Sequence, residues 1–399
     1  MKYMVIVGDG MADYPITELN GLTPLEVARK PNFDFLVRNG ILGLVKTTPE
    51  RMTPGTDVAN LSILGYNPSK FYSGRGPLEA INFGINISKE DIVFRCNLVT
   101  VQDERLIDYS AGHIDTEIAS LLIKELNQKL GNRFVKFYPG VSYRHLMVIR
   151  HQSPVSRRRL LNVKCLPPHD VMNRPLKEIL PMGRGTEVLH QLMADSQKFL
   201  ENYPGWKIGK HKANMIWLWG QGKKPGMPSF LKRYGLKGAV ISAVDIIKGI
   251  GRAIGLDVID VPGATGYYDT NYEGKARYAL NALKKNDFVF IHIEAPDEAG
   301  HNADIKEKIR AIENIDKKVL GKVITGMKKY GDYKILALTD HPTPISLRTH
   351  TADPVPFVIY KNKIGTATIF QFHFDERSAK KSKLFFKQGH ELIKFFLST

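Results

Sequence analysis

Residues 288–301 read FVFIHIEAPDEAGH and set the architecture of the chain. Phe288 to Ile293 is an apolar run interrupted by one histidine, and Asp297 and His301 follow it closely. Such a run is typical of a strand buried on both faces. In open α/β sheets, ligands bind beyond the carboxyl ends of the strands. The stretch therefore predicts a buried parallel strand that brings an acid and an imidazole to a functional edge.

Two further expected strands also end at an acid, one of them followed by a histidine. Residues 335–341 read ILALTDH, and residues 3–9 read YMVIVGD. Carboxylate oxygens mixed with imidazole nitrogens suit Mn²⁺, Zn²⁺ or Fe, and do not suit Ca²⁺ or a thiolate-bound structural zinc. A single Asp-His pair in a loop is commonly a solvated turn, but the repetition predicts a two-metal centre. Its expected members are Asp9, Asp297, His301, Asp340, His341 and His350.

The order of expected elements predicts an α/β core with an insert. Strands at 41–45, 238–241, 256–261 and 355–360 alternate with helices at 244–254, 275–285, 305–329 and 383–397. This alternation is typical of a mostly parallel sheet flanked by helices. The middle has an α+β texture, with strands within 91–101 and 134–150 and helices at 116–130 and 187–201. We expect residues 1–85 and 213–399 to form the core, and residues 86–212 to form a smaller inserted domain that covers the substrate.

Composition restricts the class of protein. The chain has 399 residues, of which 43% are hydrophobic, which is typical of a globular protein of more than one domain. Cys96 and Cys165 are its only cysteines and lie far apart, which argues against a disulfide framework and a cysteine metal site. The sequence has neither an apolar run long enough to span a membrane nor a signal peptide. We therefore expect a cytoplasmic protein.

The net charge of +17 favours an anionic partner. Phosphorylated metabolites, nucleic acids and anionic surfaces all fit that sign. The excess charge is scattered, and no known nucleic-acid-binding module accompanies it. We therefore expect a small phosphorylated metabolite rather than nucleic acid or a membrane, with a plain basic surface as the simplest alternative.

Thr56 is the best candidate for an oxygen nucleophile. It follows Gly55 in a turn that opens into a helix, where backbone N–H groups favour an incoming phosphate. A metal can deprotonate a hydroxyl in that position. The alternative is that Thr56 is an ordinary helix N-cap, a common role for threonine.

The chain resembles the archaeal-type, cofactor-independent (2,3-bisphosphoglycerate-independent) phosphoglycerate mutases of the alkaline phosphatase superfamily. The resemblance extends over nearly the whole chain. Its motifs are VGDGM at 7–11, PGTDVANLS at 54–62, GRGPLEA at 74–80, APDEAGH at 295–301, TDHPTP at 339–344 and RTHT at 348–351. The fold that it implies is an alkaline-phosphatase-like core.

The resemblance also implies a mechanism with two divalent metals. Mn²⁺ is the usual metal of the family, and Zn²⁺, Co²⁺ and Mg²⁺ are alternatives. One metal would be held by Asp297, His301 and His350; the other would be held by Asp9, Asp340, His341 and the hydroxyl of Thr56. Phosphate would move from 3-phosphoglycerate to the nucleophile, glycerate would turn over, and phosphate would return to its other hydroxyl.

Three basic residues are candidates for binding the phosphate and carboxylate of the substrate. Lys248 lies in a segment where the family has a lysine, and Arg252 lies one turn further along the same expected helix. Arg75 lies between two glycines. The alternative for all three is ordinary surface charge.

At the nucleophile position the family typically has serine, and this chain has Thr56. The extra methyl group restricts the side chain and crowds the attacking oxygen. A second hypothesis is therefore a metal-dependent phosphotransferase or phosphatase acting on another small metabolite, for example as a homoserine kinase analogue. A third, a nucleic-acid-binding protein, explains the charge but leaves the metal-type residues unexplained.

Overall fold

The computed structural model describes residues 1–150, 153–204, 212–362 and 372–399. Its contacts divide the chain into two compact units. Unit 1 consists of Met1–Tyr72 and Met227–Thr399, and unit 2 consists of Ser73–Gly226. Unit 2 begins earlier and ends later than the expected insert at 86–212.

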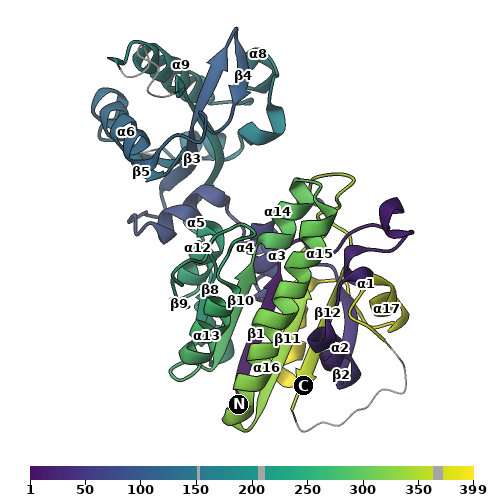
Figure 1. The fold of residues 1–399 in the computed structure, drawn as a ribbon. Helices are drawn as coiled ribbons and strands as arrows, with labels where there is room; N and C mark the ends of the chain where they lie inside the picture. Colours follow the sequence, from purple (N-terminus) through teal and green to yellow (C-terminus); the bar gives the residue numbers. More distant parts are fainter. Residues whose placement is uncertain (151–152, 205–211, 363–371) are drawn as a thin grey trace. The chain divides into compact units, whose positions relative to one another are not determined.

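Unit 1 contains an eight-stranded sheet with the order β13-β2-β12-β11-β1-β10-β8-β9. β1 lies in the middle and pairs in parallel with both β10 and β11 (Figure 1). Among the described residues, β12 is antiparallel to both of its neighbours, β11 and β2. The strands are β1 Lys2–Gly8, β2 Gly40–Val45, β8 Gly238–Ile241, β9 Asp257–Val258, β10 Phe288–Ile293, β11 Tyr333–Thr339, β12 Val355–Lys361 and β13 Phe385–Phe386.

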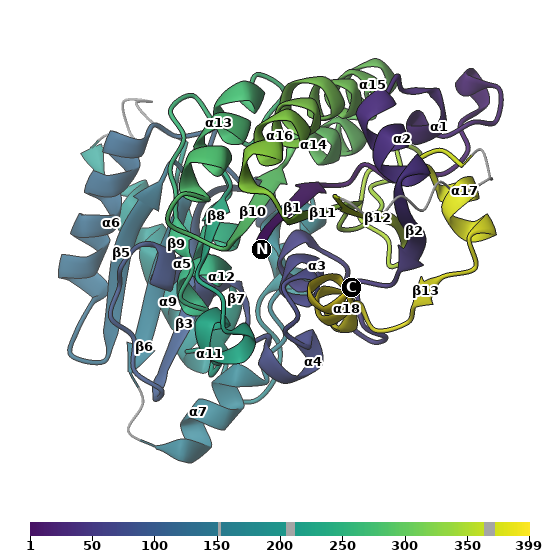
Figure 2. The same ribbon diagram turned by 90° about the horizontal axis from the view of Figure 1, so that it is seen from below.

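Helices cover both faces of this sheet. Figure 2 shows α2, α13, α15 and α16 on one face, and α3, α11, α12 and α18 on the other. β10 and β11 are buried along their whole length, as expected for strands covered on both sides. The helices of unit 1 are α1 Pro24–Val27, α2 Pro31–Arg38, α3 Thr56–Ile63, α4 Pro68–Phe71, α11 Phe230–Tyr234, α12 Asp245–Ala253, α13 Tyr272–Ala282, α14 Ala295–His301, α15 Ile305–Asn314, α16 Gly321–Met327, α17 Glu376–Lys381 and α18 Leu392–Ser398.

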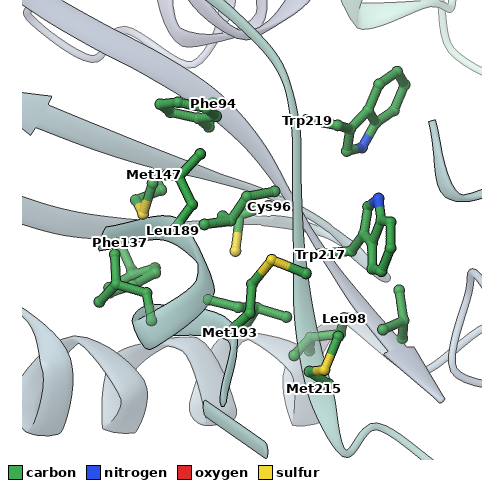
Figure 3. Close-up of a cluster of buried hydrophobic side chains, with 14 of the residues drawn as sticks. Phe94, Cys96, Leu98, Phe137, Met147, Leu189, Met193, Met215, Trp217 and Trp219 are labelled. Carbon is green, nitrogen blue, oxygen red and sulfur yellow. The ribbon is translucent and has the colours of Figure 1, made fainter. Parts of the chain in front are cut away.

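Unit 2 contains an antiparallel sheet in which the long strand β3 pairs with β4, β6 and β7. Its strands are β3 Asp91–Gln102, β4 Arg105–Asp108, β5 Val135–Val141, β6 Arg144–Arg150 and β7 Met215–Lys223. Its helices are α5 Arg75–Asn82, α6 Thr116–Leu130, α7 Pro154–Leu161, α8 Leu176–Ile179 and α9 Glu187–Glu201. The apolar core in Figure 3 joins alternate residues of β3, among them Phe94, Cys96 and Leu98, to Leu189 and Met193 of α9.

The α/β fold class and the α+β texture of the middle segment are confirmed. Local expectations differ at three places. β7 falls within residues 213–399, which we expected to belong to the core, but it pairs with β3 of unit 2 between Ile92 and Val99. The strand expected at 256–261 is reduced to Asp257–Val258, before Pro262.

The expected terminal helix at 383–397 is the third difference. Phe385 and Phe386 instead pair with the end of β2, and α18 begins only at Leu392. Gly389 lies between them at a close approach, where a side chain would come within 2.7 Å of Ser62 Oγ. Tertiary pairing therefore overrides the helical pattern of this segment. In the described part of the chain, no helix is long and apolar enough to cross a membrane.

Candidate metal centre

Three neighbouring strands of unit 1 deliver the acidic residues to one edge of the sheet. Gly8 at the end of β1 pairs with Ile293 of β10 and with Thr339 of β11. Asp9 and Asp340 come directly after β1 and β11, and Asp297 lies in the first turn of α14, just after β10. Residues far apart in sequence thus meet because their strands are adjacent and parallel.

The first cluster consists of Asp297, His301 and His350. The Nε2 atoms of His301 and His350 lie 3.3 Å and 3.4 Å from the two carboxylate oxygens of Asp297, and 3.0 Å from each other. Nδ1 of His301 lies 3.0 Å from the carbonyl oxygen of Arg348, to which it can donate. Burial opposes the protonation of His301, but its hydrogen bond to Asp297 and the charge of that carboxylate raise its pKa to about 9, so a metal ion would take the place of the proton on Nε2.

The second cluster consists of Asp9, Asp340 and His341, all of them buried. Nε2 of His341 lies 3.3 Å from Asp9 Oδ1 and 3.6 Å from Asp340 Oδ2. The hydroxyl of Thr56 lies 3.4 Å from Asp9 Oδ2 and 3.5 Å from His341 Nε2. The rings of His341 and His350 are 4.2 Å apart between centroids, so the two clusters adjoin. The structure thus brings together all seven residues that the sequence singled out as metal-type ligands.

The electrostatics of the centre favour added cations. Burial raises the pKa of Asp9, and the nearby charges of Asp340 and Asp297 raise it further. Burial also opposes the ionisation of Asp297, but hydrogen bonds from His301 and His350 hold its pKa well below the usual value. Burial lowers the pKa of His341 to about 4, so this ring is neutral at physiological pH. Three crowded carboxylates and neutral imidazole form a set that a divalent metal would satisfy.

Two observations test whether metal ions fit. In each cluster, the ligand atoms of the three residues lie within 4.8 Å of one another. Oδ1 of Asp9 is buried and, among the described residues, has no hydrogen-bond partner of good geometry. A buried carboxylate oxygen without a donor costs free energy, which a metal ion would offset. The residues therefore fit two divalent cations.

Thr56 begins helix α3 but does not cap it. The N-cap is Gly55, and Thr56 is the first helical residue. The alternative interpretation of Thr56 as an N-cap is therefore wrong, because the extended backbone of the cap position falls one residue earlier. Asn60, one turn further on, donates to the carbonyl oxygen of Thr56 at 2.8 Å and to Asp340 Oδ2 at 2.7 Å. These bonds fix the start of α3 against the second cluster.

Gly10 is required by close packing between the clusters. Its φ of 63° lies in the left-handed region, and a Cβ atom there would come within 2.7 Å of Asp297 Oδ1. Its N–H donates to Asp340 Oδ1 at 3.1 Å. The glycine therefore lets the backbone after β1 approach both carboxylates.

The sequence did not identify a buried layer behind the second cluster. Nε2 of His292 lies 3.3 Å from Asp9 Oδ2, and Nδ1 lies 3.2 Å from Glu294 Oε1. Glu294 also accepts from Lys275 Nζ at 2.6 Å, and both side chains of that pair are almost fully buried. Burial opposes the ionisation of Glu294, but Lys275 and His292 hold its pKa well below the usual value. The signal available in the sequence was one histidine inside an otherwise apolar strand.

The three expected substrate-binding residues lie in different surroundings. Lys248 and Arg252 are both on α12, where Lys248 Nζ lies 2.6 Å from Asp260 Oδ1 and Arg252 is exposed. Lys248 is thus paired with an exposed carboxylate of unit 1, and the structure does not place it against the seven residues.

Arg75 lies in unit 2, at the start of α5, with its guanidinium carbon 5.7 Å from the centre of the Trp219 ring. Arg95 lies over the same ring at 4.4 Å, and its Nε lies 3.2 Å from Glu79 Oε2. Burial lowers the pKa of Arg95, and the charges of Arg75 and Arg144 add to this against the effect of Glu79. Arginine thus outnumbers glutamate in this group, in which Arg95 and Glu79 are buried and Arg75 and Arg144 are half-buried. Of these four residues, the sequence analysis singled out only Arg75.

Known proteins match the chain over its whole length. A relative from Geobacter sulfurreducens, named as a probable 2,3-bisphosphoglycerate-independent phosphoglycerate mutase, is 48% identical over 100% of both chains. A relative of the same name, without "probable", from Methanothrix thermoacetophila is also 48% identical over 100% of both. The chain belongs to the 2,3-bisphosphoglycerate-independent phosphoglycerate mutases. The model of that family matches residues 37–205.

Solved structures agree with this family. A protein from Pyrococcus horikoshii aligns with a TM-score of 0.80 and 32% identity, covering 100% of this chain and 96% of that one. The cofactor-independent phosphoglycerate mutase of Thermoplasma acidophilum aligns with a TM-score of 0.64 and 26% identity, covering 100% of this chain and 99% of that one. The resemblance stated from the motifs is thereby confirmed.

Proposed function

We propose that this enzyme interconverts 3-phosphoglycerate and 2-phosphoglycerate through a phosphoenzyme at a two-metal centre. The observation that carries the proposal is the position of the Thr56 hydroxyl, 3.4 Å from Asp9 Oδ2 and 3.5 Å from His341 Nε2, in a chain whose full-length relatives bear the name of this activity. We place the reaction in the cytoplasm, with a small phosphorylated metabolite as the substrate.

Asp297, His301 and His350 would hold one metal, and Asp9, Asp340, His341 and Thr56 would hold the other. Bound divalent ions, Mn²⁺ first and Zn²⁺, Co²⁺ or Mg²⁺ as alternatives, would lower the pKa of the nucleophile hydroxyl and balance the negative charge of phosphate. The proton of the Thr56 hydroxyl faces Asp9 Oδ2. The buried His292 and Asn60 hold the carboxylates of Asp9 and Asp340 in place while the proton leaves.

In the first half-reaction, the oxygen of Thr56 bonds to phosphorus, and the bond from phosphorus to O3 of glycerate breaks, with a proton passing to O3. Glycerate then turns within the site. In the second half-reaction, O2 of glycerate bonds to the same phosphorus and loses its proton, the bond from phosphorus to the Thr56 oxygen breaks, and a proton returns to that oxygen. Phosphate is thus conserved, which requires that water be kept from the phosphoenzyme. We assign that covering role to unit 2 and the binding of substrate charges to Arg75, Lys248 and Arg252.

Replacement of Thr56 tests the nucleophile. Thr56→Ala should lower turnover by a factor of about 10⁴ or more, because no covalent intermediate can form. Thr56→Ser keeps the hydroxyl and removes the crowding methyl, so it should retain or raise turnover. The assay couples 2-phosphoglycerate formation to enolase, and metal content is measured on each variant. Full activity of Thr56→Ala with normal metal content would show that another group attacks phosphorus.

The second candidate is a phosphotransferase or phosphatase acting on another small metabolite, and the crowded Thr56 hydroxyl favours keeping it in the test. Free phosphate is measured in the same reactions. Stoichiometric 2-phosphoglycerate with no free phosphate supports the mutase. Free phosphate without 2-phosphoglycerate would support the second candidate.

A further inference from the structure

Thr343 occupies the space between the two clusters. It lies in the loop after β11, its side chain is fully buried, and its hydroxyl touches one residue of each cluster. Thr343 Oγ1 makes a short hydrogen bond to Asp297 Oδ1 and lies 3.3 Å from His341 Nδ1. It therefore links the two clusters by hydrogen bonds, in addition to the direct contact between the rings of His341 and His350.

The hydroxyl has one proton, which determines the direction of both bonds. A carboxylate only accepts hydrogen bonds, so Thr343 donates to Asp297 and must accept from His341. Nδ1 of His341 then carries the ring proton, and the lone pair of the neutral ring lies on Nε2. That nitrogen is the one that faces Asp9 Oδ1 at 3.3 Å and the Thr56 hydroxyl at 3.5 Å.

The backbone of Thr343 is fixed from two sides. Its carbonyl oxygen accepts from Lys308 Nζ at 2.8 Å, and its N–H donates to the carbonyl oxygen of Ala12 at 3.2 Å. Lys308 is fully buried and also binds Asp13 Oδ2 at 2.6 Å. A Cβ atom on Gly300 of α14 would come within 2.8 Å of Thr343 Cγ2, so the methyl side is also packed. The hydroxyl is thus held in one place by structure outside the clusters.

We propose that Thr343 is a positioning residue that sets the tautomer of His341 and the orientation of Asp297, and so presents both clusters to their metals. The proposal rests on the metal-centre part of the proposed function. Groups that orient metal ligands through hydrogen bonds change metal affinity by about 10- to 100-fold when removed. Thr343 does so for both sites with a single hydroxyl, which couples the two affinities.

The experiment compares Thr343→Val, which has the same shape without the hydroxyl, with Thr343→Ser, which keeps the hydroxyl. Mn²⁺ binding is measured by calorimetry on the metal-stripped protein. The Val variant should bind Mn²⁺ about 10- to 100-fold more weakly, and the Ser variant should stay within a few-fold of the natural protein. Equal Mn²⁺ affinity in the Val variant would overturn the proposal. Thr343→Ala serves as a second hydroxyl-free variant if valine does not fold.

A second readout needs no substitution at Thr343. In ¹⁵N-histidine-labelled, metal-stripped protein, the His341 signal is assigned by its loss in His341→Gln, and its nitrogen shifts report the tautomer. The Nδ1–H tautomer is expected in the natural protein, and the Nε2–H tautomer there would overturn the proposal. If the natural protein binds no Mn²⁺ but has the Nδ1–H tautomer, the proposed function fails while the hydrogen-bond assignment of Thr343 stands.

Discussion

Lys275 and Glu294 form the buried ion pair behind the second cluster, and breaking it should be costly. The side chain of Lys275 is 0% exposed and that of Glu294 is 4% exposed. Lys275→Met keeps the length and apolar stem of the side chain but leaves the Glu294 carboxylate buried without its cation. Removal of one partner from a buried pair costs about 3–5 kcal/mol in the free energy of unfolding.

Glu294 keeps hydrogen-bond donors after Lys275 is replaced. A second substitution that removes the charge of Glu294 should therefore recover part of the lost stability. Ser242 Oγ and the N–H of Ala243 still donate to Oε1, at 2.7 Å and 3.0 Å. In the double variant Lys275→Met with Glu294→Gln, the neutral amide keeps an oxygen for these donors and has no charge to bury. The double variant should therefore be more stable than the sum of the single effects predicts, by at least about 2 kcal/mol.

An exposed pair between α16 and α13 provides the control. Lys322 Nζ lies 2.9 Å from Glu273 Oε2 of α13, with the two side chains 46% and 59% exposed. Lys322→Met should cost less than about 1 kcal/mol. Unfolding in urea is followed by circular dichroism. Tryptophan fluorescence follows unit 2 separately, because all three tryptophans lie within 73–226, and it serves as the reference for substitutions in unit 1. If Lys275→Met costs no more than Lys322→Met, the buried pair contributes little and the reasoning is refuted.

Two further predictions concern unit 2. Burial, with the charge of Arg144, lowers the pKa of His145 to about 3. As the pH falls, His145 is protonated in the unfolded chain before it is protonated in the folded protein. The stability present above pH 6.5 is therefore lost as the pH falls, by about 2 kcal/mol between pH 7 and pH 5. Urea unfolding followed by tryptophan fluorescence should show this loss, and His145→Gln should flatten it; an unchanged slope would contradict the assignment. Arg75→Gln should lower kcat/KM for 3-phosphoglycerate by about 10-fold or more with normal metal content, since a neutral amide cannot replace the charged fork of arginine. Lys381→Gln, on the exposed end of α17, should change little; equal effects would mean that Arg75 acts only through the overall charge.

The sequence predicted that seven residues would meet at one site, and the structure brings them together, in part because three of them follow recognisable strands. Asp9, Asp297 and Asp340 follow apolar runs whose parallel pairing brings their ends to one edge. The second layer could not be predicted in the same way. Lys275 is an ordinary helical lysine in the sequence, and its burial depends on where α13 packs against β10. Thr343 lies inside a family motif, but its bond to Asp297 appears only when the loop after β11 is placed beside the start of α14.

The local errors have the same origin. Periodicity predicted helix at 383–397, but the end of β2 offered an unpaired edge that Phe385 and Phe386 fill. β7 precedes the part of the chain in which the α/β rhythm resumes, yet it does not join that sheet, because β3 is long enough to pair with β7 and with β6 at once. Sequence patterns indicate which element can form, whereas the partner of each strand edge is decided by long-range pairing.

The arrangement of buried charge explains why the centre is open to cations on one side. Behind the second cluster, His292 lies against Asp9 and is held in turn by Glu294 and Lys275. Beneath the loops, Lys308 binds Asp13 and fixes the backbone of Thr343. Lys275 and Lys308 are fully buried, and each already has its own carboxylate partner, so the two lysines orient the centre without neutralising its negative charge. The remaining negative charge of Asp9, Asp297 and Asp340 faces the hydroxyl of Thr56 and the imidazoles, where divalent ions and the phosphate of the substrate can share it. Asp9, Asp340 and Asp297 are thus each held from behind by a side chain outside the two clusters, namely His292, Asn60 and Thr343, which favours a centre whose carboxylates are already oriented before any ion binds.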